Sequence, residues 1–379
     1  MQKTMRRHDL DWLRVLVFGL LIIYHVGMFF VPWGWHIKNA VIYDDLRWPM
    51  IFINQWRLPI LFVISGMGTY YALSKRNLRQ FNIERSLRLG IPLLFGMLVI
   101  VPPQVYFERI ANEQFLGSYW DYYTSISFSR GTYPEGNISW HHLWFLPYLL
   151  LFSIVLSPLF IYLKRTKTRF IEWVKRLISN WYGFYLFVFP LFLAEAFIEP
   201  FFPTTHALIG DWFTITYYIL LFFYGFILIA TGTIFWNALV KVRKKALLIG
   251  CISFTLLILR WLFIEADDWP QHLAEAFLKI INVWSWILVL FAYAAQYLNK
   301  PSKYLQYANR AVYPFYILHQ TITVILGYYL MDQDWSFIVK GGIMVVGTFL
   351  ISWFIYDLII LRIPMFYPLF GLKNRKKMP

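Results

Sequence analysis

Cysteine is nearly absent from this chain, which has a single cysteine, Cys251, among its 379 residues. One cysteine excludes an intrachain disulfide and any metal cluster that needs several thiolates. A thiol nucleophile at Cys251 is compatible with this count, but no neighbouring pattern supports one. The sequence therefore predicts no metal site, and its candidate functional residues are of other types.

Charged residues are also scarce, at 15% of the chain, whereas 59% of the residues are hydrophobic and the mean hydropathy is +0.53. A soluble domain typically keeps about a quarter of its residues charged. The composition therefore excludes one large soluble fold and indicates a surface that faces a lipid bilayer. Aromatic residues reach 21%, with 18 Trp and 26 Tyr. Both of these residue types favour the headgroup zone of a membrane, which supports the same conclusion.

Acidic residues are fewer than basic ones, so the formal net charge is +15. A protein that binds nucleic acid presents its basic residues on one soluble face, but here they form short runs between apolar stretches. We therefore expect no nucleic-acid partner. The chain also lacks low-complexity tracts and repeats of fixed period, so we predict one transmembrane domain over residues 1–379. The pattern leaves the oligomeric state open.

Long apolar stretches bounded by charge predict an all-α polytopic membrane protein of about ten transmembrane helices, because about 20 apolar residues cross the hydrocarbon layer. The first span lacks a small-residue cleavage site, so we interpret it as a retained helix rather than a signal peptide. The predicted spans are 11–31, 48–73, 89–109, 142–163, 181–201, 212–235, 246–264, 274–297, 311–331 and 337–361.

The distribution of basic residues predicts the orientation of these spans. Most of the 35 Lys and Arg residues lie before the first span, in every second loop and in the basic tail 362–379. Positive charge gathers on the cytoplasmic side of membrane proteins, so both termini are predicted to be cytoplasmic. The segment 110–141 then becomes a long external loop, whose Gly, Pro, Asn and aromatic residues favour an ordered lid.

Ionisable residues inside a span are costly and are functional candidates by default. Arg14 and His25 lie 11 residues apart in the first span, which is close to three helical turns and about 16 Å of rise, so they share one face. Alternative roles are open for both. Arg14 could extend its side chain to the membrane edge or form an ion pair with Asp11. His25 could form a structural hydrogen bond between helices.

Other polar residues within or beside the spans extend this group. Arg85 and Arg88 open the third span with RxxR spacing, which suits one anion or simple anchoring at the inner face. Arg57 lies deep in the second span, where an ion pair with Glu195 or Glu199 is the structural alternative. The remaining candidates are His319 near mid-depth in the ninth span and, at the outer start of the fourth, His142, Trp144 and the neighbouring Trp140.

The depths of these residues suggest a division of labour. Arginines at the inner rim, Arg14, Arg85 and Arg88, suit the phosphates of a cytoplasmic donor, because a guanidinium binds phosphate through two hydrogen bonds. The imidazoles of His25 and His319 suit general base catalysis, because a histidine titrates near neutral pH. The outer aromatic residues, Trp140 among them, suit a platform for sugar rings, although an interfacial aromatic belt explains them equally well.

Five motifs in order resemble the acyltransferase-3 family over roughly residues 8–360. The family's opening LDxLR segment, followed by a histidine, matches Leu10–Arg14 and His25. Its second-span PxxFxxSG segment, its RxxR and its HxWFLP-like stretch match residues 59–66, 85–88 and 142–147. The stretch YPFYILHQ at 313–320 resembles a branch of the family that is credited with succinylating periplasmic glucans.

This resemblance implies an enzyme of the bacterial inner (plasma) membrane that transfers an acyl group from acyl-CoA to a sugar hydroxyl. The donor would be succinyl-CoA or acetyl-CoA, the acceptor an extracytoplasmic glycan, and no cofactor would stay bound. We assign catalysis to His25 and His319, donor binding to Arg14, Arg85 and Arg88, and substrate binding to Arg57, His142, Trp144 and Trp140. A general base and a covalent acyl-histidine are both compatible with His25.

Two alternatives from other classes remain. A glycan or proton-coupled transporter also has many spans, ionisable groups at mid-depth and basic inner loops. Against it, the sequence lacks paired Gly/Pro-broken helices in corresponding halves, and RxxR at the inner rim has no role in a proton relay. A membrane-bound lipid O-acyltransferase is the rival among enzymes, but the spacing of Arg14 and His25 favours the acyltransferase-3 family.

Overall fold

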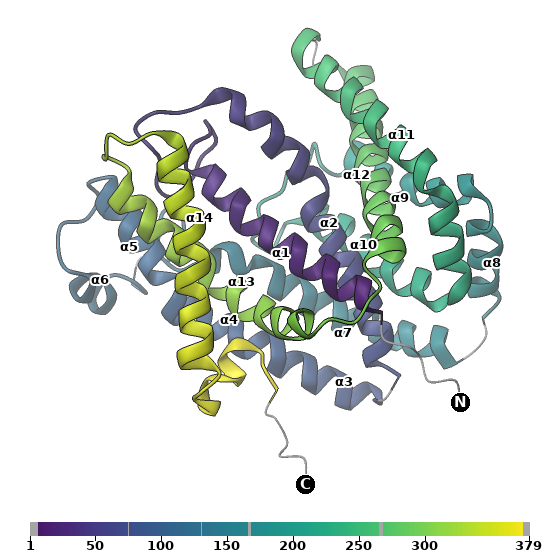
Figure 1. Cartoon of the computed structure of the whole chain (residues 1–379), viewed down its shortest axis with the longest axis horizontal. Helices are drawn as coiled ribbons and strands as arrows, with labels where there is room; N and C mark the ends of the chain where they lie inside the picture. The colour runs from purple at the N-terminus through teal and green to yellow at the C-terminus, as the bar shows by residue number, and fades with distance from the viewer. Residues whose placement is uncertain (1–6, 75, 130, 166–167, 265–267, 374–379) are drawn as a thin grey trace. The chain divides into compact units, whose positions relative to one another are not determined.

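A computed structural model describes residues 7–74, 76–129, 131–165, 168–264 and 268–373, and these residues form helices and loops with no β-strand (Figure 1). The α-helices are α1 (His8–Met28), α2 (Arg47–Ala72), α3 (Leu78–Arg85), α4 (Ile91–Phe95), α5 (Pro102–Ala111), α6 (Tyr119–Ser125), α7 (Phe145–Arg165), α8 (Arg169–Ile178), α9 (Val188–Phe197), α10 (Trp212–Ala230), α11 (Thr233–Phe263), α12 (Trp269–Tyr297), α13 (Lys303–Leu330) and α14 (Phe337–Phe354). Three π-helical turns, η2 (Ser86–Gly90), η3 (Gly96–Ile100) and η6 (Ile355–Ile360), continue α3, α4 and α14. Short 3₁₀ turns are η1 (Asp44–Leu46), η4 (His141–Trp144), η5 (Trp181–Phe187), η7 (Pro364–Phe366) and η8 (Pro368–Phe370).

Eight helical stretches among the described residues are long and apolar enough to cross a membrane. They overlap eight of the ten predicted spans, and the chain is therefore a multi-pass membrane protein. The eight are His8–Met28, Asp44–Ala72, Leu78–Ala111, His141–Lys164, Trp212–Ala230, Thr233–Phe263, Trp269–Tyr297 and Phe337–Ile360.

The other two predicted spans correspond to helices of a different character. The span predicted at 181–201 is the shorter apolar helix Trp181–Phe197, which combines η5 and α9. The span predicted at 311–331 lies in α13, which has 28 residues and begins earlier, at Lys303. This helix is long enough, but polar residues such as His319 and Gln320 lower its hydropathy.

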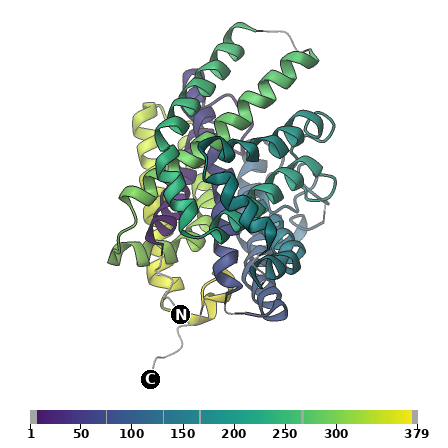
Figure 2. The ribbon, with the colours of Figure 1, turned by 90° about the vertical axis from the view of Figure 1, so that its right-hand side faces the viewer.

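The described chain divides into two compact units, which are considered separately. The first comprises Met1–Arg14, Phe52–Ile83 and Tyr148–Leu305. Within it, α11 and α12 lie side by side along most of their length (Figures 1 and 2). Ion pairs link α12 to its neighbours, because Glu275 contacts Arg260 at 2.9 Å and Lys279 contacts Glu195 at 3.6 Å. Two of the polar residues in the predicted spans, Arg260 and Glu195, thus pair with residues of α12.

The second unit comprises Val15–Ile51, Glu84–Pro147 and Gln306–Pro379. Its apolar core joins the end of α1, the loop after it, α13 and α14 through seven buried residues: Val26, Phe29, Phe30, Ile37, Val324, Leu330 and Met344. Inside this core the hydroxyls of Thr323 on α13 and Thr348 on α14 lie 3.2 Å apart. The helices that carry the two predicted catalytic histidines are therefore packed into one rigid core.

Candidate active site

Two histidines from opposite ends of the sequence meet inside the second unit. Nδ1 of His25 on α1 lies 2.8 Å from Nε2 of His319 on α13, and the two rings are nearly parallel, with an interplanar angle of 4°. Both side chains are buried, with relative exposures of 9% and 0%. The structure therefore brings together the two residues that the sequence assigned to catalysis, although 294 residues separate them.

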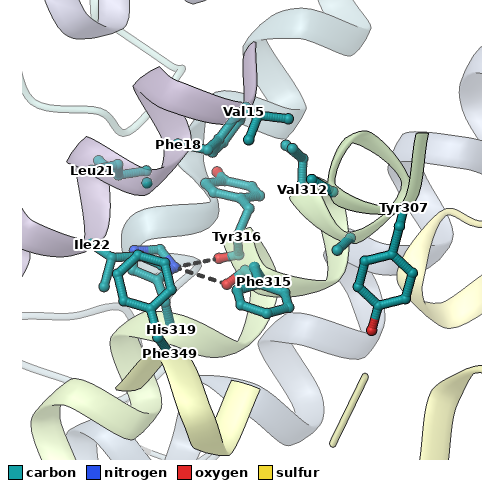
Figure 3. A pocket seen from close by; sticks show the side chains of 13 residues that line it. Val15, Phe18, Leu21, Ile22, Tyr307, Val312, Phe315, Tyr316, His319 and Phe349 are labelled. Atoms are coloured by element: carbon teal, nitrogen blue, oxygen red, sulfur yellow. Dashed lines mark hydrogen bonds between the residues drawn. The ribbon is translucent and has the colours of Figure 1, made fainter. Parts of the chain in front are cut away.

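Backbone carbonyls determine which nitrogens of this pair carry protons. Nδ1 of His319 lies 2.8 Å from the carbonyl oxygen of Tyr316 and 3.2 Å from that of Phe315 (Figure 3). An oxygen only accepts, so Nδ1 of His319 must be the donor, and its Nε2 then accepts from Nδ1 of His25. The basic lone pair of a neutral His25 is consequently on Nε2. Such an oriented imidazole is suited to remove a proton from a hydroxyl.

Two further aromatic side chains enclose the histidine pair. The ring of His142 meets His319 edge-on, with centroids 5.1 Å apart, while Nε2 of His142 donates to the carbonyl of Ile317 at 3.1 Å. The indole of Trp35 lies against His25, with ring centroids 5.2 Å apart. His142 was predicted to bind substrate, and the structure places it next to His319 of the histidine pair.

Trp35 is positioned by a lysine that fastens the loop between α1 and η1. The ammonium of Lys38 donates to three backbone carbonyls of this loop, those of Met28 at 2.6 Å, Val31, and Trp33 at 3.1 Å. Three convergent hydrogen bonds from one charged donor fix the loop's path. Burial lowers the pKa of Lys38 from 10.5 to about 8.

This lowered pKa predicts an alkaline limit to activity. Because the pKa falls, the ammonium is present below pH 8 and is lost above it, where an unburied lysine stays charged up to about 10.5. We expect acyl transfer to decline above about pH 8, as the loop that carries Trp35 loses a donor. The Lys38→Arg variant should lack this decline, because a guanidinium does not titrate there. Identical alkaline limbs in the two pH–rate profiles would contradict the assignment.

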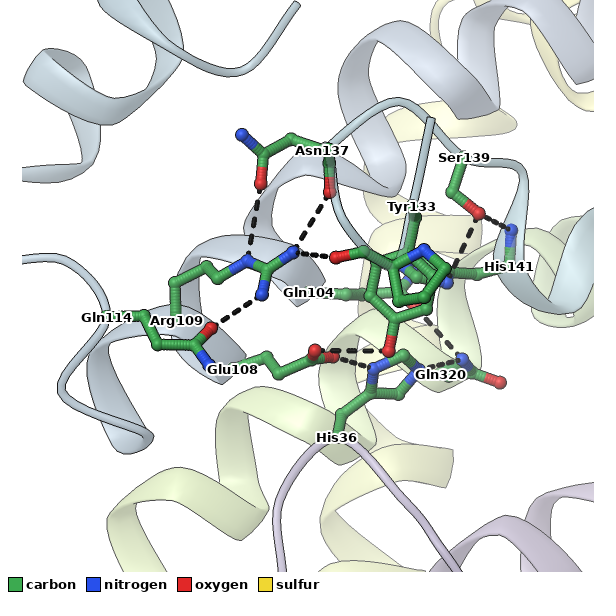
Figure 4. A network of polar contacts seen from close by, with 12 residues as sticks. His36, Gln104, Glu108, Arg109, Gln114, Tyr133, Asn137, Ser139, His141 and Gln320 are labelled. Atoms are coloured by element: carbon green, nitrogen blue, oxygen red, sulfur yellow. Dashed lines mark hydrogen bonds and ion pairs between the residues drawn. The ribbon is translucent and has the colours of Figure 1, made fainter. Parts of the chain in front are cut away.

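A second polar cluster in the same unit surrounds Glu108 at the end of α5. Its carboxylate contacts Nδ1 of His36 and accepts a hydrogen bond from the hydroxyl of Tyr133 at 3.1 Å (Figure 4). Burial and the negative charge of Glu108 raise the pKa of Tyr133 to about 12, so this hydroxyl stays protonated and donates. On its other side, Nε2 of His36 lies 3.1 Å from the amide nitrogen of Gln320, the residue after His319.

The two clusters are joined through neighbouring residues. Trp35 contacts both His25 and His36, with the latter ring centroids 5.0 Å apart. Gln320 also donates to the side chain of Gln104 at 3.0 Å. A buried carboxylate, an imidazole and two amides therefore lie next to the histidine pair. Such a set of donors and acceptors is suited to hydroxyl groups.

Arg109 fastens the segment that carries Tyr133. Its guanidinium donates to the backbone carbonyls of Pro134 and Gly136, at 2.5 and 2.9 Å, and to the side chain of Asn137 at 3.3 Å (Figure 4). Within the predicted external loop 110–141, these bonds hold the turn in a defined shape. The loop also contains the short helix α6, whose N-terminus is capped by Ser118 and Asp121.

The two arginines of the RxxR motif lie at the junction of α3 and a π-helical turn. Arg85 ends α3, and Arg88 lies within η2 (Ser86–Gly90). The hydroxyl of Tyr313 on α13 donates to the carbonyl of Arg88 at 3.2 Å, which fixes this turn against the helix of His319. Single π-helical turns are frequent at functional sites.

The C-terminal segment packs beside this junction. Gly371 has a φ of 62°, and a Cβ there would lie 2.0 Å from the Tyr313 ring, so only glycine fits. Lys373 pairs with Glu84 at 2.5 Å. The tail was predicted as residues 362–379, of which 374–379 lie outside the described residues.

Arg14 and Arg57 belong to the first unit. Arg14 contacts Asp11 at 3.8 Å, the pairing that the sequence had suggested as its structural alternative. Arg57 is buried and donates to the side chain of Asn54 at 3.1 Å. Trp140 and Trp144 lie in the second unit at η4, and the side chain of Trp144 is buried. The assignments of these four residues to donor and acceptor binding stay predictions.

Sequence reasoning missed Glu108, His36 and Gln320. Glu108 falls within the predicted span 89–109, so the rule that flags ionisable residues in spans applied to it. His36 directly follows Trp35 in the loop after the first predicted span, outside the segments in which ionisable residues were sought. Gln320 is adjacent to His319 and carries no charge, so no comparable signal marked it.

Comparisons with known proteins identify the family of this chain. A family model described as "Acyltransferase domain" (Acyl_transf_3) matches residues 7–357. Among similar proteins, Glucans biosynthesis protein C of Salmonella paratyphi B is 25% identical over 385 residues, which covers 97% of this chain and 94% of the relative. The proteins of that name from Salmonella enteritidis and Salmonella gallinarum give the same values. No solved structure matches the chain. The chain therefore belongs to the acyltransferase-3 family and is a multi-pass membrane acyltransferase.

Proposed function

We propose that the protein is an O-acyltransferase of the bacterial inner membrane that moves an acyl group from cytoplasmic acyl-CoA to a hydroxyl of an extracytoplasmic glycan. One observation carries this proposal. The histidine pair is buried, and backbone carbonyls hold it so that the lone pair of His25 is on Nε2. Family membership supplies the reaction class, and this pair is equipped for its proton transfer.

The donor side rests on Arg85, Arg88 and the orientation of the helices. By the positive-inside rule the RxxR junction faces the cytoplasm, as do both termini, and acyl-CoA is a cytoplasmic metabolite with several phosphates. Arginines bind phosphates through paired hydrogen bonds. Acyl-CoA acts here as a substrate, so the proposed reaction needs no bound cofactor.

The acceptor side rests on the cluster around Glu108. Sugars present many hydroxyls, and a buried carboxylate with an imidazole and amides offers both acceptors and donors to them. The relatives named Glucans biosynthesis protein C support a glucan as the acceptor. The predicted acyl groups are succinyl and acetyl, and the acceptor chemistry is the same for both.

The reaction is one acyl transfer. As the acceptor oxygen attacks the thioester carbonyl, its proton passes to Nε2 of His25, while Nδ1–H keeps its bond to His319. The C–S bond then breaks, and the CoA sulfur leaves with the proton returned from His25. The products are the ester and free CoA. If the same lone pair instead attacked the thioester directly, an acyl-histidine would form before the acceptor reacted.

A radiolabel assay with purified protein in detergent tests this function. With acyl-labelled CoA and periplasmic glucan as acceptor, we expect label to move to the glucan and free CoA to appear in equal amount. A protein in liposomes that carries glucan across the bilayer without releasing CoA would instead be the transporter. Label that stays on the protein when acceptor is omitted, and that is lost in His25→Asn, would identify the acyl-histidine route.

A further inference from the structure

An apolar cavity extends along α13 from His319, the member of the histidine pair that lines it. Its volume is about 180 Å³, and it lies between α1, α13 and Phe349 of α14 (Figure 3). His319 lines one end, and Tyr307 lines the other. Twelve residues of α13 separate these two, which is about 18 Å of helical rise.

Among the described residues, the lining of the cavity has no polar atom directed into it that could bind a charged or polar group. Of its 13 described lining residues, three carry polar side-chain atoms, and each directs them to a partner within the protein. Tyr307 donates to Asp357 at 2.9 Å, Tyr316 to the carbonyl of His142 at 2.6 Å, and His319 to the carbonyls of α13. Hydrocarbon is therefore the chemistry that this space accommodates, because an unpaired charge there would lose its hydration.

The cavity is also too small for a whole ligand. Sites for complete small molecules have volumes of about 300–1,000 Å³. A cavity of about 180 Å³ can hold only part of a ligand, and the rest of the ligand must lie outside it. Because His319 lines its end, that remainder meets the catalytic pair.

Helix geometry separates the cavity from the RxxR junction. The α13 residues that line the cavity, from Tyr307 through Ala311 and Phe315 to His319, form one face of the helix. Tyr313, which bonds the carbonyl of Arg88, projects about 150° away from the centre of that face. The backbone of Arg88 therefore contacts α13 through Tyr313, away from the centre of the cavity face.

We infer that this cavity binds the hydrocarbon chain of the transferred acyl group, so that the enzyme selects apolar acyl groups longer than acetyl over succinyl. The inference rests on the proposed function and replaces the predicted succinyl and acetyl groups with longer apolar ones. The thioester carbonyl sits at the His319 end, and the chain extends along the cavity toward Tyr307. A succinyl carboxylate in the same place would be buried without a partner.

Binding of labelled acyl-CoA by the purified protein measures this preference without catalysis. Burial of each methylene should tighten binding about fourfold, so affinity should rise from acetyl-CoA through butyryl-CoA to hexanoyl-CoA. Pentanoyl-CoA and succinyl-CoA are nearly equal in length but differ in a terminal carboxylate. Pentanoyl-CoA should bind at least about tenfold more tightly.

Gly19 on α1 provides the variant that fills the cavity. A Cβ added there meets only Phe349, at 4.0 Å, so Gly19→Leu should fold while its side chain occupies the space. It should keep acetyl-CoA binding and lose the gain with chain length. Gly342→Leu is the matched control, because that glycine on α14 is exposed, lies outside the cavity and has nothing within 4 Å of an added Cβ.

The outcomes separate this inference from the proposed function. No binding of any acyl-CoA by the wild type would overturn the proposed function and, with it, the inference. Equal affinities for all chain lengths, or a preference for succinyl-CoA, would overturn the inference alone. The inference would also be overturned if a phospholipid co-purified with the wild type but not with Gly19→Leu, and if Gly19→Leu kept the chain-length dependence of the wild type. The cavity would then hold a membrane lipid.

Discussion

Replacing His25 with Ala is expected to reduce acyl transfer to glucan by roughly 10²–10⁴, because a positioned general base contributes about that much to the rate. Binding of acyl-CoA should change little, since the phosphate contacts proposed for Arg85 and Arg88 remain. The rate of glucan labelling and the dissociation constant of acyl-CoA measure the two effects. A His25→Ala enzyme with native turnover would eliminate His25 as the general base.

The structure offers a more exact test in His25→Asn. The Asn amide nitrogen can reproduce Nδ1–H, which donates to His319, but it has no group at the position of Nε2. This variant should be as inactive as His25→Ala while keeping the contact between α1 and α13. His319→Gln, which keeps a polar atom near Nε2, should cost less, because a hydrogen bond between helices contributes only about 0.6–2 kcal/mol. Recovery of activity in His25→Asn would show that only the hydrogen bond matters.

Loss of both Arg85 and Arg88 is expected to weaken acyl-CoA binding by about ten- to a hundredfold for each arginine, which corresponds to about 1.5–3 kcal/mol per residue. The physical reason is the loss of charge-assisted bonds to phosphate. Equilibrium binding to Arg85→Ala, Arg88→Ala and the double variant measures this. Lysine at either position should restore little, because an ammonium is a point charge without the planar fork of arginine.

A matched control separates donor binding from membrane anchoring. Arg79 lies on α3 near the same junction and is exposed, so Arg79→Ala removes one positive charge outside the RxxR motif. It should leave acyl-CoA affinity close to that of the wild type. Equal losses in Arg79→Ala and Arg88→Ala would mean that only the overall charge of this rim matters.

Local sequence patterns sufficed for much of the architecture and part of the site. Eight predicted spans are membrane-length helices because long apolar stretches leave a chain few other choices. His25 and His319 were recognised as candidates because an ionisable side chain inside a transmembrane helix is energetically costly and is usually functional. Their contact was beyond local reasoning, since it depends on how α1 packs against α13 across 294 residues.

The features that sequence could not supply follow from tertiary contacts. α13 begins at Lys303 rather than near 311, because a window that measures hydropathy does not register the polar first turns of a helix. The proton positions of the histidine pair depend on the contacts of His319 with two backbone carbonyls of α13, those of Phe315 and Tyr316. Glu108 and His36 lie 72 residues apart in the sequence, and no motif around either residue predicts their contact.

The hydrogen bonds from Arg109 to the turn after Tyr133 have a consequence for how acceptor preference could change by substitution. Two of its bonds go to main-chain carbonyls, those of Pro134 and Gly136, which exist whatever side chains the turn carries. Glu135 between them can therefore be exchanged while the turn keeps its shape and Tyr133 its hydrogen bond to Glu108. Under the proposed function, substitution at Glu135 is therefore expected to change which acceptor is preferred while the bonds of Arg109 keep the turn, and with it Tyr133, in place.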